Sequence, residues 1–133
     1  MLLLYFGIVC CISPAYAKTR VTHFDVQHKN KYVELRIDLS KQTDFNIFTL
    51  SNPERLVIDL KHAEWSPSNS TVKSNTSLVK TIRHGKPDAN HLRIVAELTA
   101  PVTIVDSNLG TGSGTSRHNL TVALQKSAAP PVR

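Results

Sequence analysis

The chain has 133 residues, of which 41% are hydrophobic and 20% are charged, and its formal net charge is +6. This length predicts a single domain that its own hydrophobic core can hold together. Both cysteines, Cys10 and Cys11, lie near the N-terminus, which excludes a disulfide framework or thiol chemistry from the rest of the chain.

The N-terminal segment, residues 1–17, is an apolar run that ends in Ala15-Tyr16-Ala17, the small-x-small pattern of a cleavage site. The run is shorter than the roughly 20 apolar residues that a transmembrane helix needs. We therefore expect a secretory signal peptide rather than an uncleaved anchor, and an exported protein without a membrane span after cleavage. Removing seventeen residues from 133 leaves 116, and the net charge of +6 stays with them.

An exported domain with this net charge does not meet nucleic acid as a routine partner. Anionic polymers of a cell envelope, such as peptidoglycan with its carboxylates, are the counter-charges that it would meet. The alternative is that the positive charge only keeps a small domain soluble.

Alternating apolar and polar residues predict a series of short β-strands. In the first half of the chain these are His23–His28, Val33–Leu39, Phe45–Leu50 and Arg55–Leu60. Asn52-Pro53 predicts a hairpin corner between the last two, because proline fixes its own φ and restricts the residue before it. We assign the side chains of Phe24, Phe45 and Phe48 to the core.

The pattern starts again in the second half of the chain. The predicted strands there are Val79–Ile82, Leu92–Leu98, Pro101–Val105 and Leu120–Leu124, with a turn at Arg83–Gly85 and loops at Trp65–Thr71 and Asn108–Gly114. No segment carries the apolar rhythm of a long amphipathic helix, and at most one helical turn is expected, within Ser77–Ile82.

The two halves match each other strand by strand, which predicts an internal duplication. Val21-x-x-Phe24 corresponds to Val79-x-x-Ile82, Arg36–Ser40 to Val95–Thr99, and Leu56–Leu60 to Leu120–Leu124, at offsets of 58, 59 and 64 residues. A duplication predicts an all-β sandwich of two similar sheets of about four strands each. A chance alignment of alternating strands is the alternative.

No group of residues has the spacing of a catalytic or metal site. The six histidines form no HExxH or comparable zinc pattern, no GxSxG surrounds a serine, and Gly110–Gly114 lacks the GK[ST] ending of a phosphate loop. We therefore expect no catalytic residue, no metal and no cofactor in this chain.

Two polar sets are candidates for ligand binding. Arg55 and Asp59 share one face of a strand, so we expect them to form cross-strand charge pairs on the surface or to contact a ligand. Lys80, Arg83 and Arg93, with Lys86, lie around the predicted turn, and the arginines suit carboxylates or phosphates unless the set is only a solvated rim.

Two aromatic residues, Trp65 and Tyr32, lie near the predicted strand ends. Each either stacks on a sugar ring or caps the core of the sandwich.

The stretch Phe45–Leu60, FNIFTLSNPERLVIDL, resembles a known family. Together with Val33–Leu39, Val79–Gly85 and Leu92–Leu98, which follow in the expected order, it is similar to the AMIN domain of the bacterial cell envelope. The resemblance covers Val21–Leu124, and the stretch from Asn52 to Leu60 looks closest to the version found in periplasmic N-acetylmuramoyl-L-alanine amidases.

The resemblance implies a two-sheet β-sandwich that binds peptidoglycan and holds an amidase at the division septum in the periplasm. In that family a proline-rich linker leads to a zinc-dependent catalytic domain. We accordingly expect a signal peptide at 1–17, an AMIN-like domain at 18–126 and the start of such a linker at 127–133. The zinc ligands and catalytic glutamate have no counterpart here, so we expect a truncated reading frame or a stand-alone module that is itself no enzyme.

Related modules in type IV pilus secretins imply a different function. In this alternative the chain is an adaptor that binds a protein, such as a divisome or other envelope component, instead of the wall.

Overall fold

The computed structural model describes Gly7 and residues 18–67, 73–74, 76–111 and 118–127. Apart from Gly7, the predicted signal peptide lies outside these residues, as do 128–133 of the predicted linker. Residues 68–71 and 112–114 of the two predicted loops lie outside them too.

The described part of the chain folds into ten β-strands and contains no helix. The strands are β1 (Thr19–Lys29), β2 (Tyr32–Leu39), β3 (Phe45–Leu50), β4 (Arg55–Lys61), β5 (Ala63–Trp65), β6 (Lys73–Ser74), β7 (Val79–Asp88), β8 (His91–Leu98), β9 (Val102–Thr111) and β10 (His118–Lys126). The all-β prediction is confirmed.

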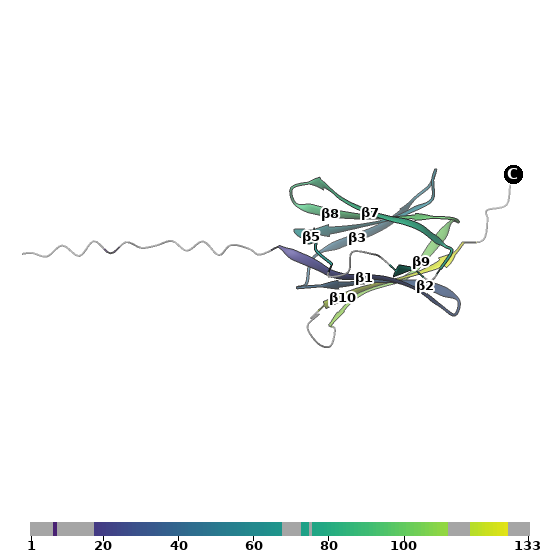
Figure 1. Cartoon of the computed structure of the whole chain (residues 1–133), viewed down its shortest axis with the longest axis horizontal. Helices are drawn as coiled ribbons and strands as arrows, with labels where there is room; N and C mark the ends of the chain where they lie inside the picture. The colour runs from purple at the N-terminus through teal and green to yellow at the C-terminus, as the bar shows by residue number, and fades with distance from the viewer. Residues whose placement is uncertain (1–6, 8–17, 68–72, 75, 112–117, 128–133) are drawn as a thin grey trace, which may run out of the picture.

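The strands form two sheets that lie as two layers, with sheet B above sheet A in Figure 1. Sheet A has six strands in the order β5-β1-β2-β10-β9, and β6 pairs with β1 beside β5. Sheet B has four strands in the order β3-β4-β8-β7. Only β5 and β6 run parallel to their neighbour β1; the other pairs are antiparallel. The predicted sandwich is confirmed.

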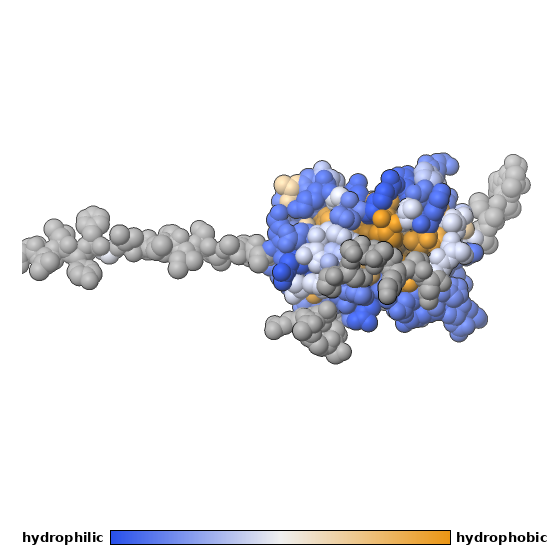
Figure 2. Space-filling model, in the orientation of Figure 1, coloured by the Kyte–Doolittle hydropathy of each residue, from blue (hydrophilic) through white to orange (hydrophobic). Residues whose placement is uncertain are grey.

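The core lies between the two sheets, where alternate side chains of the central strands meet. Leu35 and Ile37 of sheet A and Ile58 and Ile94 of sheet B are at most 1% exposed and belong to one apolar cluster. Figure 2 shows hydrophobic residues between the two layers and hydrophilic residues over their outer sides. Removal of this apolar area from water is the main favourable term of folding.

Trp65 closes one side of the sandwich. Its ring centroid lies 5.7 Å from that of Phe24 in sheet A, and 4.5 Å from that of His84 in sheet B, stacked at 11°. The interpretation of Trp65 as a cap on the core is therefore confirmed. Tyr32, which is 37% exposed, does not belong to the core.

The topology supports the predicted duplication, and each sheet combines strands from both halves of the chain. Each half contributes two hairpins, β1–β2 and β3–β4 from the first and β7–β8 and β9–β10 from the second. If every strand is replaced by its counterpart, the order β1-β2-β10-β9 of sheet A becomes the order β7-β8-β4-β3 of sheet B. Each sheet therefore contains one hairpin from each half.

The strand register follows the same correspondence. Leu35 pairs with Val122 in sheet A, and their counterparts at the predicted offsets, Ile94 and Ile58, pair in sheet B. A chance resemblance between strands would not reproduce both the order and the register, so the alternative of a chance alignment is not supported.

Two local predictions are wrong because strands extend further than their apolar pattern. Arg83–Gly85 is not a turn: β7 continues to Asp88, with Gly85 paired to Arg93, and the turn lies at Ala89 and Asn90. Asn108–Thr111 is not a loop, because it pairs with β10 along β9. Pairing with a neighbouring strand supplies backbone hydrogen bonds, and the local sequence pattern does not predict them.

The two sheets should contribute equally to one cooperative core. Leu35→Ala in sheet A and Ile94→Ala in sheet B should each lower the free energy of unfolding by about 3 kcal/mol, because both side chains are fully buried. Denaturant unfolding measures this, with Val105→Ala as the control, since Val105 is 48% exposed and should change little. A large loss for only one of the two core variants would contradict a shared core.

Candidate functional site

The outer face of sheet B gathers most of the predicted site residues. Leu56, Ile58 and Leu60 of β4 point into the core, so the residues between them and at their ends point outward. The same alternation holds in β8, and the registers of β3 and β7 extend the face to both edges. The outward side chains that matter here are Phe48, Arg55, Val57, Asp59, Arg83, Arg93, Val95 and Glu97.

Asp59 and Arg93 form the central ion pair of this face. They are directly opposite in the β4–β8 register, and Nε and Nη2 of Arg93 donate to Oδ1 and Oδ2 of Asp59 at 2.8 and 2.9 Å. This hydrogen bonding raises the pKa of Arg93. A guanidinium has five N–H donors, so three remain for another partner. The side chain of Arg93 is 43% exposed, so those donors can be reached from solvent.

Arg55 has a structural role on the same face. Its Nε donates to the carbonyl of Pro53 at 3.1 Å, and its Nη2 lies 3.5 Å from the carbonyl of Ser51. Asn52 between them has φ of 61°, a conformation that asparagine tolerates better than most residues. Arg55 therefore fastens the hairpin corner, and Asp59 finds its cross-strand partner in Arg93 instead.

Arg83 is a more exposed cation than Arg93 on this face. Its side chain is 68% exposed, and its Nη2 lies 4.0 Å from Oε2 of Glu97, too far for a hydrogen bond. Oε2 of Glu97 accepts a hydrogen bond from Thr81 at 3.1 Å. Little within the described structure therefore restrains the guanidinium of Arg83.

A row of apolar side chains crosses the face between these charges. Phe48, Val57 and Val95, which we call the apolar row, are opposite one another across β3, β4 and β8. Val57 is only 3% exposed although it points away from the core, so its neighbours on the face cover it. The prediction that Phe48 belongs to the core is wrong, because its register with Val57 places it on the outer face.

A hollow of about 370 Å³ opens at the β7 side of the face. None of its lining residues is acidic; they are Arg83, His84, Gly85, Lys86, Pro87, Arg93 and Val95. A Cβ at Gly85 would have no atom within 4 Å, so the hollow is open at this position. The hollow joins both accessible guanidinium groups to the end of the apolar row.

The structure does not bring Lys80 together with these residues. Lys80 lies at a bulge of β7, where the register shifts between Val79 and Thr81, and it is exposed. Lys86 lines the hollow, and the neighbouring amine of Lys18 lowers its pKa. Of the predicted basic set, Arg83, Lys86 and Arg93 therefore line one hollow, and Lys80 is not among its lining residues.

The outer face of sheet A has a different character. Its register places the carboxylates of Asp25, Glu34, Asp38 and Asp106 on this face. Lys29 pairs with Glu34 at 3.1 Å and Arg36 with Asp38 at 3.1 Å, and no apolar row crosses it. An anionic ligand would therefore be favoured on sheet B and repelled from sheet A.

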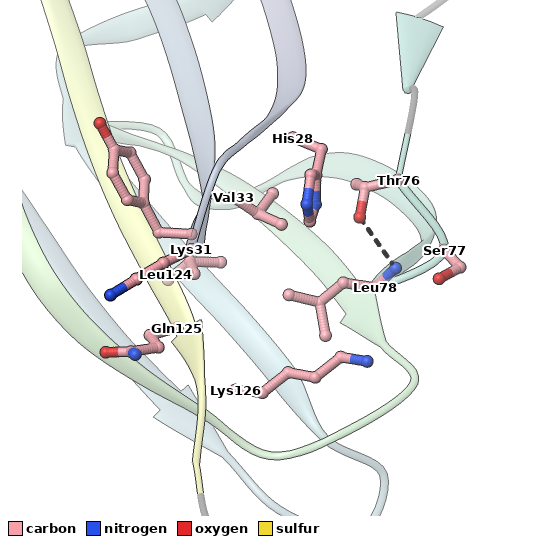
Figure 3. A pocket seen from close by; sticks show the side chains of 10 residues that line it. His28, Lys31, Val33, Thr76, Ser77, Leu78, Leu124, Gln125 and Lys126 are labelled. Atoms are coloured by element: carbon pink, nitrogen blue, oxygen red, sulfur yellow. Dashed lines mark hydrogen bonds between the residues drawn. The ribbon is translucent and has the colours of Figure 1, made fainter.

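A second hollow, of about 540 Å³, lies at one end of the sandwich (Figure 3). Val33, Leu78 and Leu124 form its apolar part, and Lys31 and Lys126 are at its margin. Thr76 accepts a hydrogen bond from the backbone N–H of Leu78 at 3.2 Å there. Its polar lining residues come from three segments of the chain, and no arginine is among them.

Within the described ranges, no three His, Cys, Asp or Glu side chains are grouped so that they could hold a metal ion. The same part of the chain contains no helix of the length and apolarity that a membrane crossing needs.

The fold defines a class of protein: an all-β sandwich of two sheets. The family model of the AMIN domain matches residues 23–124, and the chain therefore belongs to the AMIN domain family. Such domains are non-catalytic targeting modules of amidases and secretins, occur typically in periplasmic or exported proteins, and bind peptidoglycan or proteins. A comparison with curated proteins found no match.

The Asp59–Arg93 pair should add little to stability, because both groups are partly solvated. A double-mutant cycle of Asp59→Ala and Arg93→Ala in thermal or denaturant unfolding should give a coupling energy under about 1 kcal/mol, falling with added salt. A coupling of about 3 kcal/mol or more, typical of a buried pair, would make the pair structural.

Asp88 links stability to pH at the β7–β8 turn. Hydrogen bonds from His91 and from the backbone N–H of Asn90 lower the pKa of Asp88. The carboxylate therefore stabilises the fold above the unfolded-state pKa of about 3.9, and the contribution is lost as the pH falls through the folded-state pKa. Asp88→Asn should lower Tm at neutral pH, and the difference from wild type should disappear in strong acid. If the difference in Tm between Asp88→Asn and wild type is the same at acid and neutral pH, the linkage between Asp88 and stability is contradicted.

Proposed function

We propose that this chain is a wall-targeting module that binds peptidoglycan through the outer face of sheet B. The observation that carries the proposal is the juxtaposition of two accessible guanidinium groups, Arg83 and Arg93, with the apolar row and a hollow without acidic lining residues. Sheet A, built on the same pattern, lacks this combination.

The chemistry of the wall polymer matches the two parts of the face. Peptidoglycan carries carboxylates on its peptides, and guanidinium groups bind carboxylates through paired, charge-assisted hydrogen bonds. Its sugar rings and methyl groups present apolar surface that can pack against Phe48 and Val95. The Asp59 carboxylate holds Arg93 in a fixed orientation, which reduces the entropy that binding costs.

Membership of the AMIN domain family supports the wider setting that we propose. In the proposed function the chain is exported to the periplasm and holds an N-acetylmuramoyl-L-alanine amidase against septal peptidoglycan during daughter-cell separation. The hydrolytic chemistry belongs to a zinc-dependent catalytic domain, and this chain supplies only position. The net charge of +6 assists by attracting the polymer over longer range.

Co-sedimentation with purified sacculi tests the binding face. The protein from Lys18 to Arg133 is suitable, because the strands and the core that the structure describes lie between Thr19 and Lys126. Arg83→Ala combined with Arg93→Ala should reduce binding by at least about tenfold, since each change removes a charge-assisted hydrogen-bond donor. Binding should also weaken as salt rises.

Arg36→Ala is the matched control, because Arg36 is an ion-paired arginine on the opposite face. It should leave binding within about twofold of wild type. An equal loss for Arg36→Ala would indicate a general charge effect, and unchanged binding of the Arg83 and Arg93 double variant would reject the face.

A further inference from the structure

Strand β3 leaves one edge of sheet B open. It is the last strand in the order β3-β4-β8-β7, and among the described strands it pairs only with β4. A strand edge of this kind presents a row of N–H and C=O groups that another strand can use.

The hydrogen-bonding pattern between β3 and β4 identifies which backbone groups of β3 face the open edge. The N–H of Lys61 donates to the carbonyl of Asp44 at 3.0 Å, so the backbone of Asp44 faces β4. Backbone direction alternates along an antiparallel strand, so the backbone groups of Phe45, Ile47 and Thr49 face the opposite side. These three residues offer three N–H and three C=O groups in a regular row.

The other edges carry the features that usually prevent strand addition. Strand β7 has two irregularities in its register and contains Lys80, Lys86 and Pro87. Strand β9 has a bulge and Asp106. Strands β5 and β6, beside β1, are only three and two residues long.

Strand β3 has none of these features. Its sequence, FNIFTL, contains no charge, no proline and no glycine, and its six residues pair with β4 without a register shift. Aromatic and β-branched residues, which favour strands, occupy four of the six positions. Within the described part of the chain, this edge is regular and carries none of the protective features of the other edges.

We propose that two copies of this chain associate by antiparallel pairing of β3 with β3, which joins the two B sheets into one sheet of eight strands. With Ile47 of one copy opposite Ile47 of the other, Phe45 is opposite Thr49. All three open-edge residues then form hydrogen-bonded pairs, and no like charges face each other within the strand. The interface is isologous, so the same surface serves both copies.

The arrangement of the outer face of sheet B favours a second copy of this chain as the partner at the β3 edge. The two-fold axis of this pairing is perpendicular to the sheet, so both outer faces point to the same side. The two apolar rows then become neighbours, because each ends at Phe48 of β3. This part rests on the proposed function: two wall-binding faces on one side bind a polymer with higher avidity than one. The pairing itself is independent of wall binding.

Sedimentation equilibrium over a range of concentrations tests the pairing in the protein from Lys18 to Arg133. Wild type should reach twice the monomer mass. Thr49→Pro should remain monomeric, because it removes an N–H that faces the open edge without removing a hydrogen bond to β4. Thr49→Ala keeps the N–H and is the matched control, and it should still dimerise.

Amide hydrogen exchange gives a second readout that needs no variant. The amides of Phe45, Ile47 and Thr49 should exchange fast at low concentration and slowly at high concentration, since β4 supplies them no acceptor. A wild-type mass that stays monomeric, a Thr49→Pro variant that dimerises as wild type does, or exchange at these amides that is independent of concentration would overturn the proposal. Binding of sacculi by a protein that stays monomeric would overturn the β3 pairing and leave the proposed function supported.

Discussion

The two central strand pairs, β2–β10 and β4–β8, are the constraint on which the rest of the structure depends. Each pair joins a strand of the first half of the chain to a strand of the second half. A sheet therefore cannot be completed by either half alone, and the core between the sheets closes only when both halves have exchanged hairpins. The long sequence separation of these pairs makes the fold cooperative at the cost of slow assembly.

The same constraint creates the candidate site. The β4–β8 register sets Asp59 opposite Arg93, and it aligns Val57 with Val95 in the row beside them. At the corresponding place in sheet A, the β2–β10 register pairs Glu34 with Ala123. The duplicated scaffold is thus symmetric in its backbone and asymmetric in its outer side chains, and this asymmetry is the reason that we propose sheet B as the binding face.

The apolar alternation of the sequence was enough to predict the sandwich and the correspondence between its two halves, but not that each sheet would combine a hairpin from each half. It could not predict the side of Phe48, because Ile47 and Phe48 are both apolar and either could point inward. The apolar alternation also could not predict that Asp59 pairs with Arg93. A cross-strand pair depends on the strand register, and these two residues are 34 positions apart. Arg83–Gly85 was misassigned as a turn, since glycine in an edge strand leaves the same local pattern as glycine in a corner.

The most direct test of the account is a map of amide chemical-shift changes on titration with soluble peptidoglycan fragments. The account predicts that the largest changes lie in β4 and β8, at Asp59, Arg93 and their neighbours, and extend to Arg83 at the hollow. Changes centred on Arg36 and Thr121 of sheet A, or on the hollow around Leu78 and Leu124, would contradict it.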